Sequence, residues 1–164
     1  MNRFGCDRSA LIEQHLADVE PSTTGVLFVD LVAIARNYES IALVCPSAEC
    51  GGVVKADAYG LGLAQVAPAL AKAGCKTFFV ATLSEAETLR SVISKARIIV
   101  LNGLLPGTAR CFGMLGVQPT LNSLAEIREW QANCGGTGVA GEVAIQFDTG
   151  MTRLGLTPEE CLEL

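Results

Sequence analysis

The sequence predicts an α/β fold in which helices cover a parallel sheet. Short, almost continuously apolar runs alternate with segments whose apolar residues recur at helical spacing. Strands that are apolar on both faces are typical of parallel sheets, because helices cover them. The hydrophobic fraction of the 164 residues is 50% and the charged fraction only 18%, so the chain can bury a large core. Composition and periodicity alone leave both an open doubly wound sheet and a (βα)8 barrel possible.

The expected elements follow a leader, residues 1–24, that shows no clear period. Strands are predicted over residues 52–55, 77–83, 97–101, 117–121 and 142–147. Helices are predicted to begin after Asp30, after Gly62, and at three capping boxes: Ser84 with Glu87, Ser123 with Glu126, and Thr157 with Glu160. The segment 102–115 has no defined pattern, and residues 133–141 are read as a glycine-rich connection. The sequence ends at Leu164, about two turns into the last helix.

Charge and hydropathy exclude several classes of function. The net charge is −5 and no basic cluster is present, which argues against nucleic-acid or anionic-membrane binding. The longest apolar stretch, residues 26–35, is broken by Asp30 and is shorter than the roughly 18 residues that a membrane span needs. Acidic residues interrupt any signal-peptide pattern at the N-terminus. We therefore expect a cytoplasmic protein.

The seven cysteines are scattered and form no C-x-x-C pair, so we interpret them as small buried apolar residues in a reducing compartment. No metal site is expected, because Cys45 and Cys50 are not followed by a second ligand pair. The one histidine, His15, stands alone in the leader and supports no catalytic triad.

The first candidate site begins at Lys55, which closes the apolar strand 52–55. A desolvated lysine amine can form a Schiff base, although a lysine at a strand end can also simply reach solvent. Tyr59 could donate its hydroxyl to a phosphate or could merely cover the end of the sheet. The glycines of 60–62 suggest a dinucleotide loop, but Gln65 replaces the third glycine of that motif.

The second candidate site is the segment 148–155, which follows the strand 142–147. It presents Asp148, a threonine and Arg153 between glycines that free the backbone. Arginine suits a planar carboxylate, a phosphate or a phenolate, because its N–H groups form a rigid fork. A loop arginine that pairs with Asp148 or stays in water is the alternative.

Together these segments resemble the N-terminal part of the alanine racemase family, fold-type III enzymes that use pyridoxal 5′-phosphate (PLP). The resemblance covers residue 26 to the end, with both long motifs in family order. The matching stretches are Val29-Asp30-Leu31 through Asn37-Tyr38, Val53-Val54-Lys55-Ala56-Asp57-Ala58-Tyr59-Gly60-Leu61-Gly62, Phe79-Val80-Ala81-Thr82 with Glu85-Ala86, and Asp148-Thr149-Gly150-Met151-Thr152-Arg153-Leu154-Gly155.

The resemblance implies a role for three residues. Lys55 resembles the lysine that forms the internal aldimine with PLP and serves as the base on the D-face of the substrate. Tyr59 matches the tyrosine on the cofactor phosphate, and Arg153 matches the arginine that faces the PLP phenolic oxygen and the substrate carboxylate. The implied reaction is two-base proton transfer that interconverts L-alanine and D-alanine, a peptidoglycan precursor. One departure is Gln146, where many members have a lysine that is often carbamylated and holds the arginine.

The resemblance also implies an incomplete (βα)8 TIM-type barrel over residues 25–164, with about five βα units and no C-terminal β-domain. A complete barrel typically needs about 250 residues. In the family the enzyme is a homodimer, and the opposite-face tyrosine base comes from the partner's second domain. We therefore expect the chain alone to be inactive. The alternatives are a non-catalytic PLP-binding barrel, like the PLP homeostasis proteins, and a non-functional remnant. Related decarboxylases share the lysine, but the Arg153 motif favours the racemase.

Overall fold

The computed structural model describes residues 12–14, 16, 17, 19–137 and 141–164. The chain divides into two units, Met1–Asp30 and Leu31–Leu164. In the described part of the first unit, residues 12–14 are helical and residues 23–30 belong to no strand. His15 lies outside the described residues. The boundary drawn at residues 24 and 25 from the sequence stays a prediction.

The second unit alternates helices and strands from one end to the other. Its elements are α2 (Leu31–Val44), β1 (Gly52–Val53), α3 (Lys55–Gly60), α4 (Leu63–Lys72), β2 (Thr77–Val80), α5 (Leu83–Val92), β3 (Arg97–Val100), α6 (Ala109–Leu115), β4 (Gln118–Leu121), α7 (Leu124–Thr137), β5 (Ala144–Ile145) and α8 (Pro158–Cys161). The helices expected after Asp30 and after Gly62 are therefore confirmed.

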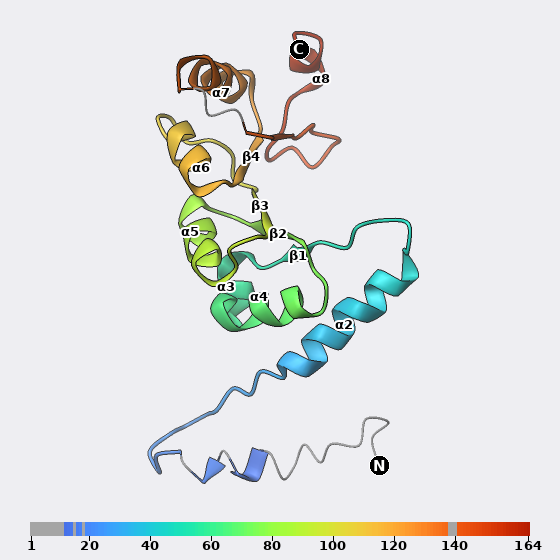
Figure 1. The fold of residues 1–164 in the computed structure, drawn as a ribbon, viewed down its shortest axis with the longest axis vertical. Helices are drawn as coiled ribbons and strands as arrows, with labels where there is room; N and C mark the ends of the chain where they lie inside the picture. The colour runs from blue at the N-terminus through green and yellow to red at the C-terminus, as the bar shows by residue number, and fades with distance from the viewer. Residues whose placement is uncertain (1–11, 15, 18, 138–140) are drawn as a thin grey trace. The chain divides into compact units, whose positions relative to one another are not determined.

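The five strands form one parallel sheet in the order β1-β2-β3-β4-β5. A doubly wound sheet reverses its strand order at a switch point, whereas a barrel adds each new strand on the same side. The order here is strictly sequential, and Figure 1 shows α5, α6 and α7 on one side of the strands. The topology is therefore that of a barrel wall, the alternative that composition and periodicity left open.

The core lies between the sheet and these helices. Alternate strand residues point into it, because side chains along a strand alternate between its two faces. The strand contribution consists of Val54, Phe78, Val80, Ile98, Val100 and Leu121. From the helices, Leu89 of α5 is fully buried, and Phe112 of α6 packs edge-to-face on Trp130 of α7 with ring centroids 6.4 Å apart. Sequential packing of this kind fixes each helix over the two strands it connects.

Two helix starts differ from the sequence prediction. The capping box of α5 is Thr82 with Glu85, two residues before the predicted pair, because β2 ends at Val80 and Thr82 is still extended (φ −123°, ψ 161°). Helix α6 was missed, since it is short and its N-cap makes no side-chain hydrogen bond. Burial of Phe112 holds it in place, and tertiary packing commonly overrides weak local signals.

The C-terminal elements also correct some boundaries. Helix α7 runs to Thr137, through residues predicted to form a connection, and β5 covers only Ala144–Ile145 of the predicted 142–147. At the start of α7 the Ser123 hydroxyl accepts the backbone N–H of Glu126 at 3.3 Å. This bond is one of the two that the predicted capping box requires.

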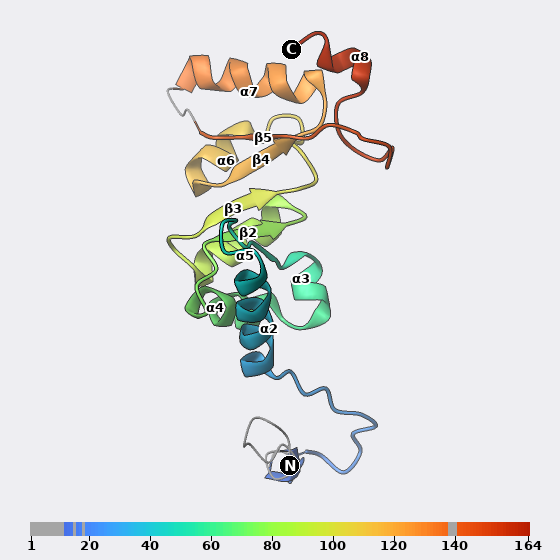
Figure 2. The same ribbon diagram turned by 90° about the vertical axis from the view of Figure 1, so that its right-hand side faces the viewer.

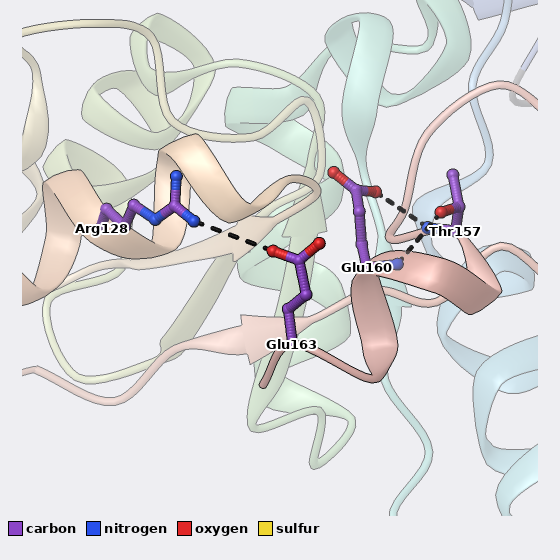
Figure 3. Close-up of polar contacts among 4 residues, drawn as sticks. All are labelled: Arg128, Thr157, Glu160 and Glu163. Carbon is purple, nitrogen blue, oxygen red and sulfur yellow. Dashed lines mark hydrogen bonds and ion pairs between the residues drawn. The ribbon is translucent and has the colours of Figure 1, made fainter.

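The third predicted capping box is confirmed. Thr157 and Glu160 each accept the other's backbone N–H at the start of α8, as Figure 3 shows. The nearby ion pair between Arg128 and Glu163 spans 3.9 Å between exposed side chains. Such a pair contributes little to stability, so the cap is the contact that defines this helix.

The burial of the cysteines is predicted from the sequence and can be compared with the structure. The cysteine interpretation is correct for Cys75, which is buried, but wrong for Cys45 and Cys111, which are exposed. Among the described residues, no helix has both the length and the apolar character that crossing a bilayer requires. The same part of the chain contains no cluster of three or more potential metal ligands.

Candidate active site

Lys55 stands at the carboxyl end of β1, one edge of the sheet. Val54, just before it, is fully buried and donates its backbone N–H to Phe79 O at 2.9 Å, so the chain is still paired one residue before the lysine. Lys55 itself is half-buried. In parallel α/β folds this end of the strands is where functional residues gather.

The four residues after Lys55 form a left-handed turn that the sequence did not predict. From Ala56 to Tyr59, φ lies between 52° and 57° and ψ between 37° and 50°. This conformation costs about 1–2 kcal/mol for each residue that is not glycine. Such a run persists only where its surroundings hold it, and it is a feature of functional sites. Its last residue, Tyr59, is 63% exposed, so its hydroxyl is accessible to a ligand.

Hydrogen bonds to both ends hold this turn. The Asp57 carboxylate accepts the first N–H of α4, from Leu63, at 2.7 Å. At the other end, Glu85 Oε1 accepts Ala56 N at 2.6 Å, while Glu85 Oε2 accepts Ala81 N at 2.7 Å. Sequence reasoning gave Glu85 no role. The signal that could have identified it is the threonine three residues earlier, which completes a capping box.

The second segment is a closed loop that displays Arg153. Asp148 Oδ1 accepts the N–H groups of Gly150 and Thr152, each at 2.9 Å, and these bonds hold the pKa of that carboxyl below its usual range. The loop closes where Asp148 N donates to Leu156 O at 3.0 Å. Arg153 is exposed, and its Nη2 lies 3.1 Å from Met151 Sδ. Sulfur is a weak acceptor, so the guanidinium is presented to ligands from solvent.

Gln146 stands at the position where the resemblance noted above implies a lysine in many members. Its Nε2 donates to Leu154 O at 3.3 Å, and its backbone carbonyl accepts Leu156 N at 2.8 Å. The side-chain amide therefore binds the residue after Arg153 rather than the guanidinium. Its effect on Arg153 is exerted through the loop backbone.

The candidate residues lie at one end of the sheet, but not all in contact. Lys55 and Tyr59 share the α3 turn, and Figure 2 shows α3 and the loop after β5 at the same end of the strands. Lys55 follows β1 and Arg153 lies in the loop after β5, so the two residues come from the two edge strands of the five-stranded sheet. Lys55 and Tyr59 thus lie in one turn, whereas Arg153 follows the strand at the opposite edge of the sheet.

The inner face of the barrel wall has polar atoms without partners. The register aligns Val53, Phe79, Ile99 and Gln118 on one face, and Thr120 lies two residues further along β4 on the same face. Among the described residues, Thr120 Oγ1 and Asn122 Oδ1 are buried and have no hydrogen-bond partner. Buried polar groups are nearly always satisfied. This face therefore suits a polar ligand, water or further polar side chains.

Comparison with known proteins identifies the family. Residues 29–164 match the family model described as alanine racemase, N-terminal domain. The chain is 52% identical over 138 residues to an alanine racemase of Methylobacterium nodulans, which covers 84% of this chain and 37% of that protein. A catabolic alanine racemase of Agrobacterium fabrum is 48% identical over the same length.

Solved structures agree with the sequence matches. An alanine racemase from Bartonella henselae with covalently bound pyridoxal phosphate superposes with a TM-score of 0.80 at 41% identity, over 82% of this chain and 40% of that one. A histidine racemase from Leuconostoc mesenteroides gives 0.77 at 28% identity, over 88% of this chain and 39% of that one. The chain spans about two fifths of the length of these relatives. The parallel wall of five strands is the corresponding part of their barrel, and the chain belongs to the alanine racemase family through its N-terminal domain.

Proposed function

We propose that this chain supplies the cofactor-binding lysine of a PLP-dependent alanine racemase, which interconverts L-alanine and D-alanine. One observation carries the proposal: Lys55 follows the buried Val54 at the carboxyl end of β1 and enters a strained turn that displays Tyr59, in a chain of this family. The Bartonella relative, which holds covalently bound pyridoxal phosphate, supports the choice of cofactor.

The residues present fit that cofactor. PLP requires an amine for its aldehyde carbon, hydrogen-bond donors for its phosphate, and a cation near its phenolic oxygen. Lys55 and the exposed Tyr59 in α3, together with the exposed Arg153 in the loop after β5, would offer these three groups. When bound, the cofactor delocalises the negative charge left on the substrate α-carbon after its proton departs.

Each side chain then has a task that follows from its chemistry. The Lys55 amine would hold the cofactor and, as a free amine, would take a proton from or return it to one face of the α-carbon. The Tyr59 hydroxyl donates to a phosphate oxygen. The Arg153 guanidinium donates two parallel N–H groups to the substrate carboxylate, which orients the α-carbon.

The second base is proposed to come from a partner subunit, in a homodimeric cytoplasmic enzyme. The family resemblance places that base in a C-terminal β-domain, which corresponds to none of residues 29–164. Removing one of two bases removes transition-state stabilisation rather than binding alone. We therefore expect the isolated chain to bind PLP and to racemise alanine weakly or not at all.

The binding claim is tested by trapping. The chain is incubated with PLP, reduced with borohydride and mapped by mass spectrometry. We expect Lys55 to be labelled and the labelling to saturate with PLP concentration. The label should be lost in Lys55→Arg. The matched control, Lys72→Arg in α4, should keep the label. Label spread equally over Lys55, Lys72, Lys76 and Lys95 would contradict a specific site.

The racemase claim needs a second measurement. Racemisation of alanine and of histidine is followed with the chain alone and after addition of the C-terminal part of a relative. We expect activity on alanine only in the complemented sample. Specific Lys55 label with no racemisation of either amino acid would favour the non-catalytic PLP-binding protein instead.

A further inference from the structure

We propose that Glu85 is a positioning residue for Lys55, acting through the backbone N–H of Ala56. The inference rests on the proposed function, since it assumes that Lys55 binds the cofactor. Glu85 lies in the first turn of α5, the helix that follows β2, and β2 is the strand that neighbours β1. Within the described residues, the hydrogen bonds that its carboxylate makes go to backbone N–H groups, so we expect its action on the amine to be indirect.

The two carboxylate oxygens serve two different segments. Oε2 accepts from Ala81 N at 2.7 Å and from Thr82 N at 3.3 Å, which closes the N-terminus of its own helix. Oε1 reaches across to Ala56 N at 2.6 Å, a residue 29 positions earlier in the chain. Short hydrogen bonds to a carboxylate are among the stronger ones in proteins. One side chain therefore ties the end of β1 to the end of β2.

The bond to Ala56 lies where the backbone needs support. Ala56 is the first residue of the left-handed run, and its peptide unit is the one that follows Lys55. An N–H at the start of a helical turn has no partner within that turn. Glu85 supplies that partner and so fixes the direction in which the chain leaves the lysine. Capping of α5 requires only Oε2, so the contact made by Oε1 needs a separate explanation.

A second glutamate, Glu126, makes a comparable bridge between two segments away from the Lys55 turn. Glu126, in the first turn of α7, accepts Asn122 N at 3.0 Å and Leu104 N at 3.1 Å. It thus joins the end of β4 to the loop after β3, as Glu85 joins β2 to β1. Removing Glu126 disturbs an equivalent bridge without touching the Lys55 turn, and Thr82→Ala removes the cap of α5 while keeping the Ala56 contact.

The test compares Glu85→Ala, Glu85→Gln, Thr82→Ala and Glu126→Ala with the parent chain. The first readout is amide hydrogen exchange at Ala56 without cofactor. Exchange should be about tenfold faster in Glu85→Ala, as loss of a hydrogen bond to a charged group implies. It should stay within about twofold in the two control variants, which keep this bond. The second readout is the rate of borohydride-trapped PLP label on Lys55, expected to fall about tenfold in Glu85→Ala for the same reason.

Glu85→Gln provides the conservative rescue. In this variant one carboxylate oxygen is replaced by an NH₂ group that cannot accept, so either Ala56 N or Ala81 N loses its present acceptor. Both readouts should therefore lie between those of the parent and Glu85→Ala. If Glu85→Ala does not fold, the positioning role requires that labelling of Lys55 decreases in Glu85→Gln but not in Thr82→Ala. Equal effects in the Glu85 and Thr82 variants would overturn the positioning role, because capping alone would then explain the contact.

The outcome also separates this inference from the function on which it rests. If Lys55 of the parent chain is never labelled by PLP, the proposed function fails and the positioning role fails with it. If the parent is labelled and Glu85→Ala is labelled at the same rate, only the positioning role is refuted.

Discussion

Gly155 closes the loop that displays Arg153, and an alanine there should open that loop. Its φ of +107° is one that residues with a side chain rarely adopt. An added Cβ would lie 2.8 Å from Asp148 N and 2.9 Å from Phe147 C, backbone atoms that no side-chain rotation can move. The backbone strain costs about 1–3 kcal/mol and the crowding about 1–3 kcal/mol more. We therefore expect Gly155→Ala to destabilise the closed loop by about 2–6 kcal/mol.

Gly150→Ala is the matched control within the same loop. Its φ is +119°, but an added Cβ would meet no atom within 4 Å, so only the strain term applies. Exchange of the Asp148 and Leu156 amides, which close the loop, reports its opening, and urea unfolding reports global stability. Exchange should increase more in Gly155→Ala, by a factor that corresponds to at least about 1 kcal/mol. Equal exchange in the two variants would refute the argument from crowding.

Three further variants test other contacts. The Arg90 guanidinium donates to backbone carbonyls in two different loops. Because a single ammonium group cannot span both loops, Arg90→Lys should lower the free energy of urea unfolding by about 2–4 kcal/mol. A loss below about 0.5 kcal/mol would contradict this expectation. The rate of Lys55 labelling should not change. Asp57→Ala leaves the N–H of Leu63 without its acceptor and should cost about 1 kcal/mol in thermal unfolding, whereas an unchanged midpoint would show that water replaces the cap. Backbone N–H groups lower the pKa of Asp148 in the folded loop. The stability that the ionised Asp148 gives the loop is therefore fully present above the pKa of the unfolded carboxyl. It is lost as the pH falls through the folded pKa, below about pH 4. NMR shifts of the loop amides should show that transition, and its persistence in Asp148→Asn would refute the assignment.

Local patterns predicted much of the fold for a clear reason. The helices after Asp30 and Gly62 and the capping box at Thr157 follow from spacing within a few residues. The errors concern two helices. Helix α6 has a weak local signal and forms because Phe112 is buried, while α7 continues past Asn133 although glycines follow it. For α6, packing against distant residues outweighs local propensity.

The candidate site shows the same division. Lys55, Tyr59 and Arg153 stand in two contiguous motifs, so the sequence was enough to select them as candidates. The left-handed turn after Lys55 and its contact with Glu85 could not be read from those motifs. The partners in that contact are 29 residues apart, and only the pairing of β1 with β2 makes them neighbours.

The sequence by itself determined the parallel α/β class, the family resemblance and the candidate residues, because these depend on local periodicity and on runs of adjacent residues. Only the tertiary structure decided that the strands follow one another in barrel order, that the lysine enters a strained turn, and that Arg153 follows the edge strand opposite the one before the lysine. The physical reason is that strand order, backbone strain and bridging carboxylates arise from contacts between segments far apart in the chain, and a linear pattern does not encode which segments meet.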